Sequence, residues 1–411
     1  MNKYLLILAV DTSCDDTSAA VLRGDTVLSN IIASQTELHR PYGGVFPTVA
    51  KQAHKENIEP TVKTALKRAS IALGNKTKLT INNIDALAVT VGPGLAPALE
   101  VGLNFMKDLA IKSQKPLIAI NHIEGHALSA LAQRNHSLKK NDTLDTKNSR
   151  QLEKLIESNK KKISDNSNNT NINYPVLSIV VSGGHTEFIL FNKIGEYQIL
   201  GSSIDDAAGE CLDKIGRMLN LGYPAGPIME KFAHLGNPKA IDFPLPMTTT
   251  KSFDMSFSGL KTFSRNYIED HFGDTSLNQQ QTYDFCASAQ YGVFRHIMYK
   301  LSKVLEKYDV AEIWLGGGVA ANVNLRKMIR ETIKNTGKKV SNSDTKNPKL
   351  SPYPTSNNQI NKIIFRTPYS KRLCMDNAAI IGLVAGYKFK RGENVKKLET
   401  LSRLPRWKIG D

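Results

Sequence analysis

The sequence predicts an α/β protein built as two lobes with a ligand cleft between them. Short apolar runs alternate with longer helical patterns along the chain, which is typical of α/β proteins. The chain has 411 residues, 41% of them hydrophobic and 22% charged, which suits a globular protein and is enough for two packed lobes. A strand–turn–strand unit with a polar turn also occurs twice.

The two units share one pattern: an apolar strand, a turn that carries hydroxyls, glycines or carboxylates, and a second strand. They comprise Tyr4–Val10, Asp11–Thr17 and Ser18–Leu22 near the start of the chain, and Val176–Val181, Ser182–Thr186 and Phe188–Phe191 later. Two such hairpins bind phosphates between the lobes of the actin-like ATPase fold, so the repeat favours that fold. Hairpins with polar turns also occur in other folds, and on this pattern alone the assignment stays open.

The domain organisation follows from the same pattern. We expect residues 1–110 and about 378–411 to form the first lobe, and residues 111–377 the second. Two polar stretches, at about 135–173 and 338–362, interrupt the second lobe. They lack the apolar periodicity that buries a face of a helix or strand, so we interpret them as loop insertions.

The charge of the chain indicates an acidic partner. Its net charge is +16, and nucleic acid is the first candidate for the partner of so basic a protein. Seven of these charges lie in the polar stretches 135–173 and 335–362. Charge alone therefore leaves nucleic-acid binding open.

Cysteine spacing and hydropathy predict a cytoplasmic protein that does not contact membranes. The four cysteines are widely separated and form no CxxC pair, which favours reduced thiols. The apolar run Tyr4–Val10 is too short for the core of a signal peptide. No stretch of the sequence reaches the roughly 18 apolar residues of a membrane span.

A pair of histidines follows the predicted strand Leu117–Asn121. His122 and His126 occupy positions i and i+4 of a predicted helix, about 5–6 Å apart at Cβ, so both imidazoles can reach one metal ion. Glu124 lies roughly 200° round the helix from His122, unlike the glutamate of the metalloprotease motif HExxH, and is poorly placed as a hydrolytic base. The alternative to metal binding is a chance pair of histidines on a polar face.

Two glycine-rich turns each connect a strand to a helix. Val91–Pro97 lies between the predicted strand Ala86–Thr90 and helix Ala98–Ile111, and Ile313–Arg326 brings three consecutive glycines to a helix start. Such turns can place backbone N–H groups against a phosphate or nucleotide, and Asn322 would face the ligand with its amide. Neither turn is a Walker A or GxGxxG motif, and a packing turn without a ligand is the alternative for both.

Acidic residues mark two further segments. Ser203–Lys214 carries Asp205, Asp206, Glu210 and Asp213, which can orient ribose hydroxyls or a substrate amine, or can be charges favoured at a helix start. Asp376 can complete a metal site or cap the helix that follows it. The sequence shows no nucleophile elbow and no Ser/His/Asp order, so covalent acyl-enzyme chemistry has no candidate.

Taken together, the motifs resemble the tRNA N6-adenosine threonylcarbamoyltransferases of the actin-like ATPase superfamily, once labelled glycoprotein endopeptidases. The matching stretches follow the family's order along nearly the whole chain: Asp11–Thr17, Pro41–Gly44, Gly92–Gly102, His122–His126, Val181–Thr186, Ser203–Lys214, Tyr223–Pro227, Ser256–Thr262, Gly316–Arg326 and Cys374–Asn377. Met375, where a small polar residue is expected, and Ala225, where glycine is usual, depart from the pattern without affecting a metal ligand.

The resemblance implies a set of site residues. One divalent metal ion per subunit, Fe²⁺ first and Zn²⁺ second, would be held by His122, His126 and Asp376. Asp11, in the first phosphate turn, would assist activation as a catalytic residue. Threonylcarbamoyl-AMP would contact Val180, Val181, Ser182, Gly183, Gly184, Asp213, Gly226, Glu230 and Asn322.

The implied reaction transfers a threonylcarbamoyl group from threonylcarbamoyl-AMP to the exocyclic amine of the adenosine beside the anticodon, in tRNAs that read codons beginning with adenine, and releases AMP. Besides tRNA, the implied partners are a paralogous homologue with an inactive site and a P-loop ATPase. Three other functions stay open at this stage: a metalloprotease, an ATPase on the same fold, and a non-catalytic scaffold subunit that binds nucleotide.

Overall fold

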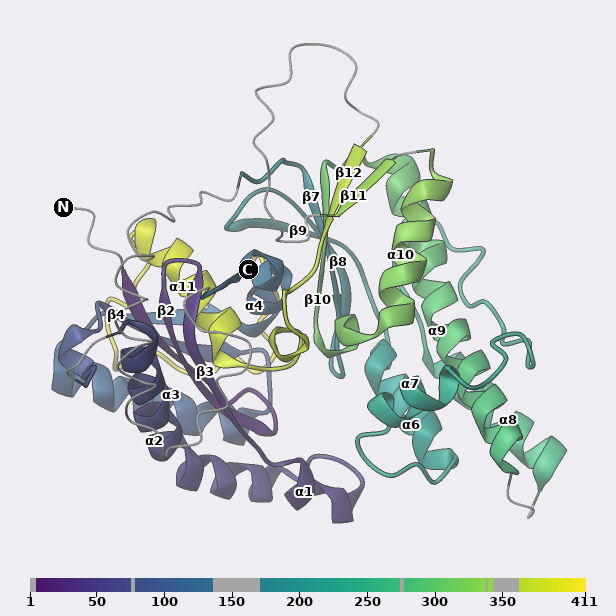
Figure 1. The fold of residues 1–411 in the computed structure, drawn as a ribbon, viewed down its shortest axis with the longest axis horizontal. Coiled ribbons are helices and arrows are strands. Elements are labelled where there is room, and N and C mark those ends of the chain that lie inside the picture. The colour runs from purple at the N-terminus through teal and green to yellow at the C-terminus, as the bar shows by residue number, and fades with distance from the viewer. Residues whose placement is uncertain (1–4, 75–77, 136–170, 274–276, 338, 343–361) are drawn as a thin grey trace, which may run out of the picture.

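A computed structural model describes residues 5–74, 78–135, 171–273, 277–337, 339–342 and 362–411 (Figure 1). Most of the two expected insertions, at about 135–173 and 338–362, lies outside these residues, so their interpretation as loops stays a prediction. The short part of the second insertion that is described, Lys339–Asn342, forms a strand. Within the described residues, no helix is both long and apolar enough to cross a membrane.

Two sheets form the framework of the described part of the chain. The first contains β1 (Leu6–Asp11), β2 (Asp16–Arg23), β3 (Thr26–Ser34), β4 (Ala86–Gly92), β5 (Leu117–Asn121) and β6 (Gln133–Arg134). The second contains β7 (Val176–Val181), β8 (Thr186–Lys193), β9 (Glu196–Ser202), β10 (Glu312–Gly316), β11 (Lys339–Asn342) and β12 (Lys362–Arg366). Their strand orders are β5-β4-β1-β2-β3-β6 and β11-β12-β10-β7-β8-β9.

The two sheets repeat one topology. β1, β2 and β3 form an antiparallel meander, and β4 and β5 add in parallel beside β1. β7, β8 and β9 form the same meander, and β10 and β12 add in parallel beside β7. The duplication confirms both predicted hairpins and the α/β class.

Helices cover the outer face of each sheet. α2 (Pro47–Ala72) and α3 (Ala96–Ser113) pack on the first sheet. On the outer side of the second sheet lie α6 (Ala208–Met218), α7 (Gly226–Ala233), α8 (Ser258–Phe272), α9 (Gln279–Lys307) and α10 (Val323–Asn335). The short elements are α1 (Thr36–His39), η1 (Arg40–Tyr42), η2 (Ile81–Asn83), η3 (Ser129–Leu131), η4 (Gly318–Ala321) and η5 (Lys371–Leu373).

Two helices, α4 (His122–Leu128) and α11 (Ala378–Lys390), lie between the sheets (Figure 1). Alternate side chains of β1 enter different cores, as the pleat of a strand requires. Leu8 and Val10 pack under α2 and α3, whereas Ile7 and Ala9 face the central core, which also takes Val180 of β7. The central core joins the lobes and holds α4, the predicted metal helix.

The pairing of two strands, β5 and β6, affects where the boundary between the two expected lobes lies. β5 and β6 lie beyond residue 110, yet both pair within the first sheet. The division of the chain into lobes stays a prediction, and these pairings favour a first lobe whose N-terminal part runs on to Arg134.

Candidate metal centre and ligand cleft

The helix α4 carries both histidines into the middle of the protein. Strand β5 ends at Asn121, whose Oδ1 accepts hydrogen bonds from the backbone N–H groups of Ile123 (2.9 Å) and Glu124 (3.3 Å) and so caps the helix. All seven residues of α4 are buried. Its polar side chains lie away from water, so each needs a partner.

Asp376, from the loop before α11, joins the two histidines. Its Oδ1 lies 3.4 Å from Nε2 of His122 and 3.1 Å from Nε2 of His126, and the two imidazole centroids are 4.6 Å apart. One ligand atom from each residue lies within 4.8 Å of the other two. Two imidazole nitrogens and a carboxylate oxygen suit a divalent transition metal, so the residues present fit a metal site. The side chain of Asp376 is 30% exposed, which gives the site an approach from solvent.

The alternative role of Asp376 was to cap the helix that follows it, but the neighbouring residue caps that helix. Asn377 is the N-cap of α11, because its Oδ1 accepts a hydrogen bond from the N–H of Ala379 at 3.0 Å. Its Nδ2 donates to the Met375 carbonyl at 2.7 Å and thereby fixes the backbone on the other side of Asp376. The Asp376 carboxylate is left to face the histidines.

The turn after β1 lies behind His122. Oδ2 of Asp11 lies 3.4 Å from Nδ1 of His122, and Oγ of Ser13 lies 3.2 Å from the same nitrogen. Asp11 is 1% exposed. Burial by itself lowers the pKa of His122, but Asp376 and Asp11 raise this pKa to about 10. A metal ion and a proton cannot occupy Nε2 of His122 at the same time, so an ion that binds there displaces the proton on that nitrogen.

Glu124 points to other elements. Its Oε2 lies 3.3 Å from Nζ of Lys388 in α11, and its Oε1 accepts a hydrogen bond from the Tyr197 hydroxyl of β9 at 2.8 Å. Glu124 is 3% exposed. With both oxygens engaged, it is not placed as a hydrolytic base, as its position round the helix predicted.

The turn after β7 is open to a ligand. A Cβ atom added to Gly183 or Gly184 would meet nothing within 4 Å, so a ligand can approach this backbone closely. Oγ of Ser182 accepts a hydrogen bond from the N–H of Gly184 at 3.3 Å and holds the turn. Val180 and Val181 are fully buried with their side chains in the two cores, so they can offer only backbone groups.

In the three-glycine turn after β10, two glycines are needed for packing. A Cβ on Gly316 would lie 2.0 Å from the carbonyl oxygen of His126. Gly317 has φ of 90°, and its Cβ would lie 2.3 Å from the Val181 carbonyl oxygen. The turn therefore brings β10 directly against the metal helix, and Gly318 alone of the three has open space around it.

The turn Val91–Pro97 packs against other described parts of the chain. The N–H of Gly94 donates to the Pro405 carbonyl at 3.2 Å, and the N–H of Leu95 donates to the Ser13 carbonyl at 2.8 Å. This geometry favours the packing alternative. The turn supports Ser13, which in turn contacts His122.

Asn322 has different partners from those we expected. Its Oδ1 accepts hydrogen bonds from the N–H groups of Asn324 (2.9 Å) and Leu325 (3.2 Å) and caps α10. Its Nδ2 donates to Oε1 of Gln290 at 2.7 Å. The amide that we expected to face a ligand is thus used within the fold, because a helix start needs a cap, and a contact between Asn322 and the nucleotide stays a prediction.

The other predicted nucleotide residues lie at, or contact, the starts of α7 and α10, near Asn322. Oδ1 of Asp213 accepts hydrogen bonds from the N–H groups of Ala225 and Gly226, both at 2.9 Å, at the start of α7. Oε1 of Glu230 accepts from the N–H of Val323 at 3.1 Å and links α7 to α10. Asp213, Gly226, Glu230 and Asn322 therefore form one continuous set.

The remaining acidic residues of Ser203–Lys214 have structural partners. Asp205 accepts hydrogen bonds from the Ser256 and Ser258 hydroxyls, at 2.5 and 2.6 Å, ahead of α8. Asp206 forms ion pairs with Lys214 (2.6 Å) and Lys261 (2.8 Å). Glu210 pairs with Lys214 at 2.9 Å. These contacts favour a structural role for all three.

Two polar residues that the sequence analysis did not single out lie within electrostatic range of the predicted metal ligands. Burial, together with Asp376, raises the pKa of Asp15. Burial, followed by the charges of His122 and His126, lowers the pKa of His185 to about 4. Asp15 lies in the polar turn Asp11–Thr17, and His185 lies in the polar turn Ser182–Thr186. Their positions in these turns were the signal that could have identified them.

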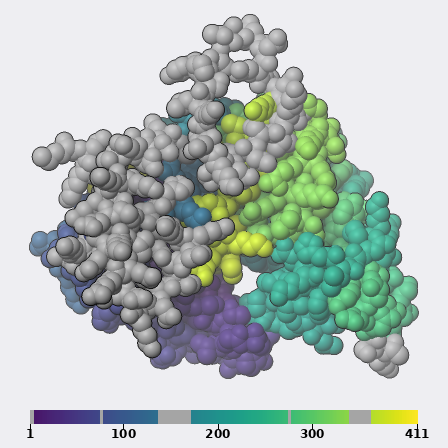
Figure 2. All heavy atoms as spheres, viewed as in Figure 1, coloured from purple at the N-terminus to yellow at the C-terminus, as the bar shows by residue number. Residues whose placement is uncertain are grey.

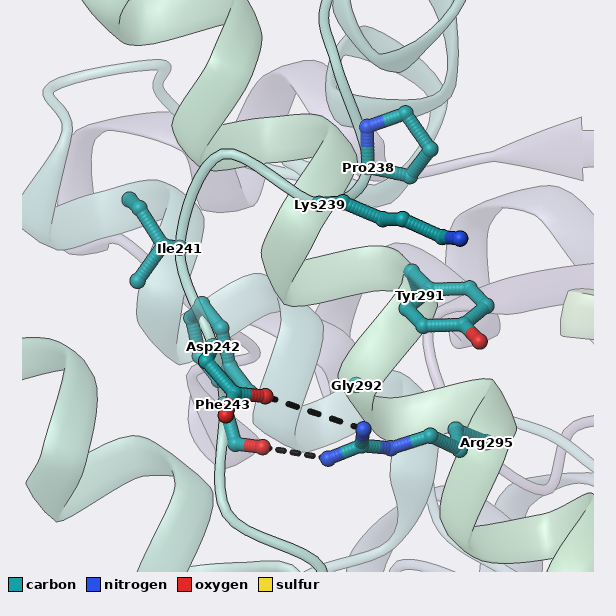
Figure 3. Close-up of a pocket in the computed structure, with 8 residues that line it drawn as sticks. All are labelled: Pro238, Lys239, Ile241, Asp242, Phe243, Tyr291, Gly292 and Arg295. Carbon is teal, nitrogen blue, oxygen red and sulfur yellow. Dashed lines mark hydrogen bonds and ion pairs between the residues drawn. The ribbon is translucent and has the colours of Figure 1, made fainter.

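A hollow between the lobes is visible in Figure 2. It is bounded by N-terminal residues (purple), C-terminal residues (yellow) and residues of the second lobe (teal). A separate cavity of about 240 Å³ lies against α9 (Figure 3). It is lined by Pro238, Lys239, Ile241, Asp242, Phe243, Tyr291, Gly292 and Arg295. None of these is a predicted site residue.

Comparisons with known proteins agree with the motifs. A sequence model of the family "tRNA N6-adenosine threonylcarbamoyltransferase" matches residues 26–140 and 156–344. Relatives with that name include one from Clostridium kluyveri, 37% identical over 414 residues and covering 100% of both chains, and one from Clostridioides difficile, 37% identical over 407 residues and covering 98% of each. A relative from Rhizobium johnstonii is 38% identical over 339 residues, covering 79% of this chain and 80% of its own.

Solved structures show the fold. The crystal structure of HypF from T. kodakarensis has a TM-score of 0.51 and 13% identity, and the match covers 97% of this chain and 49% of HypF. Full-length HypF in its phosphate- and nucleotide-bound form also has a TM-score of 0.51, with 11% identity, over 95% of this chain and 47% of HypF. The likeness agrees with the predicted actin-like architecture.

Proposed function

The chain belongs to the tRNA N6-adenosine threonylcarbamoyltransferase family, and from this premise we propose how its cleft carries out the reaction. The protein is a transferase that modifies an adenosine of tRNA. The donor is threonylcarbamoyl-AMP, the acceptor is the exocyclic amine of the adenosine beside the anticodon, and AMP is released. The convergence of His122, His126 and Asp376 beside open glycine backbone carries this proposal.

The metal site consists of Nε2 of both histidines and an oxygen of Asp376. A His₂–carboxylate set suits Fe²⁺ and Zn²⁺, and the family resemblance favours Fe²⁺. When bound, such an ion supplies Lewis-acid stabilisation of negative charge on the donor. Asp11 lies behind His122 in the structure, so its role is that of a positioning residue, which holds Nε2 toward the metal site.

The donor lies between the two lobes. Backbone groups of Val180 to Gly184 contact its threonylcarbamoyl part, because Gly183 and Gly184 leave room for a close approach. Asp213, Gly226, Glu230 and Asn322 lie beside its ribose and base, where carboxylates accept hydrogen bonds from hydroxyls. Holding donor and acceptor together supplies much of the rate, because it removes the entropy cost of bringing them together.

The cellular setting follows the resemblance. The protein acts in the cytoplasm with tRNA, a paralogous homologue with an inactive site, and a P-loop ATPase. The net charge of +16 supports tRNA as the substrate. Peptide hydrolysis is disfavoured, because Glu124 is held by Lys388 and Tyr197.

The test supplies labelled threonine, bicarbonate, ATP, an adenylate synthase, the partner proteins and a tRNA that reads codons beginning with adenine. Label in tRNA is counted for the wild type, for the double variant His122→Ala/His126→Ala, and for the control His234→Ala/His271→Ala, whose histidines are exposed. We expect label with the wild type and the control, and none with the metal-site variant. No label with the wild type, despite a working synthase, would favour an ATPase or a scaffold.

A further inference from the structure

An exposed aromatic pair lies on the first lobe between α1 and α2. The side chains of Leu38, Tyr42 and Phe46 are 51%, 56% and 45% exposed. The rings of Tyr42 and Phe46 are stacked, with centroids 4.8 Å apart and an interplanar angle of 19°. Single exposed apolar residues are ordinary, but three along one short segment indicate a contact surface.

The backbone under this pair is fixed by buried polar contacts. His39 is fully buried, and its Nδ1 accepts a hydrogen bond from the N–H of Phe46 at 3.3 Å. Its Nε2 lies 3.2 Å from Oε1 of Gln35, and Nε2 of Gln35 donates to Thr17 Oγ1 at 3.4 Å. The aromatic pair is therefore presented by a rigid segment that is anchored to β2.

The same network reaches the metal-site turn. Oγ1 of Thr17 lies 2.8 Å from Nδ1 of His54, and Nε2 of His54 lies 3.0 Å from the carbonyl oxygen of Cys14. Cys14 follows Ser13, which contacts His122. A short series of buried contacts thus connects the aromatic segment to the metal centre.

The aromatic segment also meets the second lobe. Nη1 of Arg217, in α6, donates to the carbonyl oxygen of Gly43 at 3.1 Å. Arg217 lies one helical turn beyond Asp213, which is proposed to contact the adenylate. In Figure 1, α1 and its neighbours lie below α6, and in Figure 2 the purple surface borders the hollow between the lobes. The segment that carries the pair therefore lies where the first lobe contacts α6, near the hollow between the lobes.

We propose that Tyr42 and Phe46 are a stacking platform for an unpaired base of the tRNA anticodon loop, next to the adenosine that is modified. The inference rests on the proposed function, because an acceptor amine that enters the cleft leaves the neighbouring bases of its loop at the mouth. Aromatic side chains bind splayed loop bases by stacking. Two guanidinium groups flank the segment: Arg217, and Arg40, which is 58% exposed and paired with Glu37. Arg217 supplies positive charge for the loop's phosphates, whereas the charge of Arg40 is offset by Glu37.

The test measures tRNA binding by fluorescence anisotropy without any donor, and KM and kcat for tRNA in the transfer assay. Tyr42→Ala and Phe46→Ala should each weaken tRNA binding about tenfold, which equals about 1.4 kcal/mol, with a matching rise in KM and little change in kcat. Tyr42→Phe and Phe46→Trp keep a flat ring and should bind tRNA like the wild type. Phe46→Leu keeps apolar volume without a ring and should behave like Phe46→Ala.

The control Ile111→Ala removes another exposed apolar side chain, 61% exposed on α3, and should leave tRNA binding unchanged. AMP binding, measured by calorimetry, should be equal in all variants and so report an intact cleft. Unchanged tRNA affinity in Tyr42→Ala/Phe46→Ala would overturn the inference, and a change in sedimentation instead would assign the surface to a protein partner. A wild type that binds tRNA but transfers no label would contradict the proposed function and not the platform.

Discussion

Three carboxylates near the paired histidines have different roles because their contacts differ. Asp376 faces Nε2 of both imidazoles from the exposed side, whereas Asp11 contacts Nδ1 of His122 from the buried side. Glu124 belongs to the same helix as the histidines but contacts Lys388 and Tyr197. Asp376 is thus one of three residues that could hold a metal ion, Asp11 contacts His122 from behind, and Glu124 connects α4 to α11 and β9.

Replacement of Asp11 by Asn should weaken metal binding about 10- to 100-fold, because the amide lacks the charge that holds the His122 ring. Zinc affinity of the purified variant, measured by competition with a chelator, gives the test. Activity per bound metal ion should change little. Wild-type metal affinity together with lost activity would contradict the positioning role and give Asp11 a direct part in the reaction.

Replacement of Glu124 by Gln should lower the free energy of unfolding by about 3 kcal/mol, because it leaves the Lys388 ammonium, only 13% exposed, without its anionic partner. Urea unfolding measures this loss, and transfer to tRNA should persist. The control Glu196→Gln breaks an exposed pair with Lys193 and should change stability little. Lost transfer at unchanged stability would be inconsistent with a structural role.

At the scale of elements, polar side chains on one face of α9 fix the position of the long segment between α7 and α8. Its side chains contact that segment at successive points: Arg295 donates to the Phe243 carbonyl, the Tyr299 hydroxyl to the Thr248 carbonyl at 2.9 Å, and Lys300 to Thr250 Oγ1 at 2.8 Å. Nε2 of His296 accepts a hydrogen bond from the Ser256 N–H at 3.2 Å. The segment leads into α8, so the placement of α8 depends on these side chains.

His296 should make stability depend on pH. Burial, followed by the charge of Lys300, lowers its pKa to about 4, below the ordinary value of 6.5. The unfolded chain therefore binds a proton more readily, so the stability contributed by neutral His296 is present above pH 6.5 and falls as the pH drops toward 4. Between pH 7 and pH 5 the wild type should lose about 2 kcal/mol more than His296→Gln, as measured by urea unfolding. The variant His271→Gln, at an exposed histidine, should keep the wild-type slope, and equal slopes for wild type and His296→Gln would exclude this effect.

At the scale of the whole molecule, two lobes of the same topology enclose a shared core. The helices α4 and α11 lie between the sheets, so the residues that could hold a metal ion come from the junction of the lobes. The pair Glu124–Lys388 and the hydroxyl of Tyr197 connect the same helices to β9. The proposed ligand site is therefore bordered by elements of both lobes.

The net charge of +16 predicts that tRNA binding depends strongly on salt. Raising KCl from about 50 to 200 mM should weaken tRNA binding at least tenfold, because cations on the protein release counterions from tRNA phosphates. AMP binding, with a single phosphate, should change far less. Anisotropy titrations at several salt concentrations give the slope, and a slope near zero would contradict an electrostatic tRNA surface.

Much of the fold and part of the site could be predicted from local pattern. The strand–turn–strand repeat predicted both hairpins, and the spacing of His122 and His126 predicted that their rings lie together, because helical periodicity places i and i+4 on one face. The same periodicity placed Glu124 away from His122. A contact between Asn322 and the nucleotide stays a prediction, and local pattern did not show that this side chain also caps the start of α10.

The sequence by itself therefore determined the features that depend on neighbouring residues. These are the hairpins, the paired histidines, the glycine turns and the order of motifs that mark the family. Tertiary structure decided which distant groups meet. Asp376 lies 250 residues from His126, and its meeting with the histidines depends on how α11 packs against α4 between two sheets. Local periodicity carries no information on that packing, which is set by burial of apolar side chains from both lobes in one core.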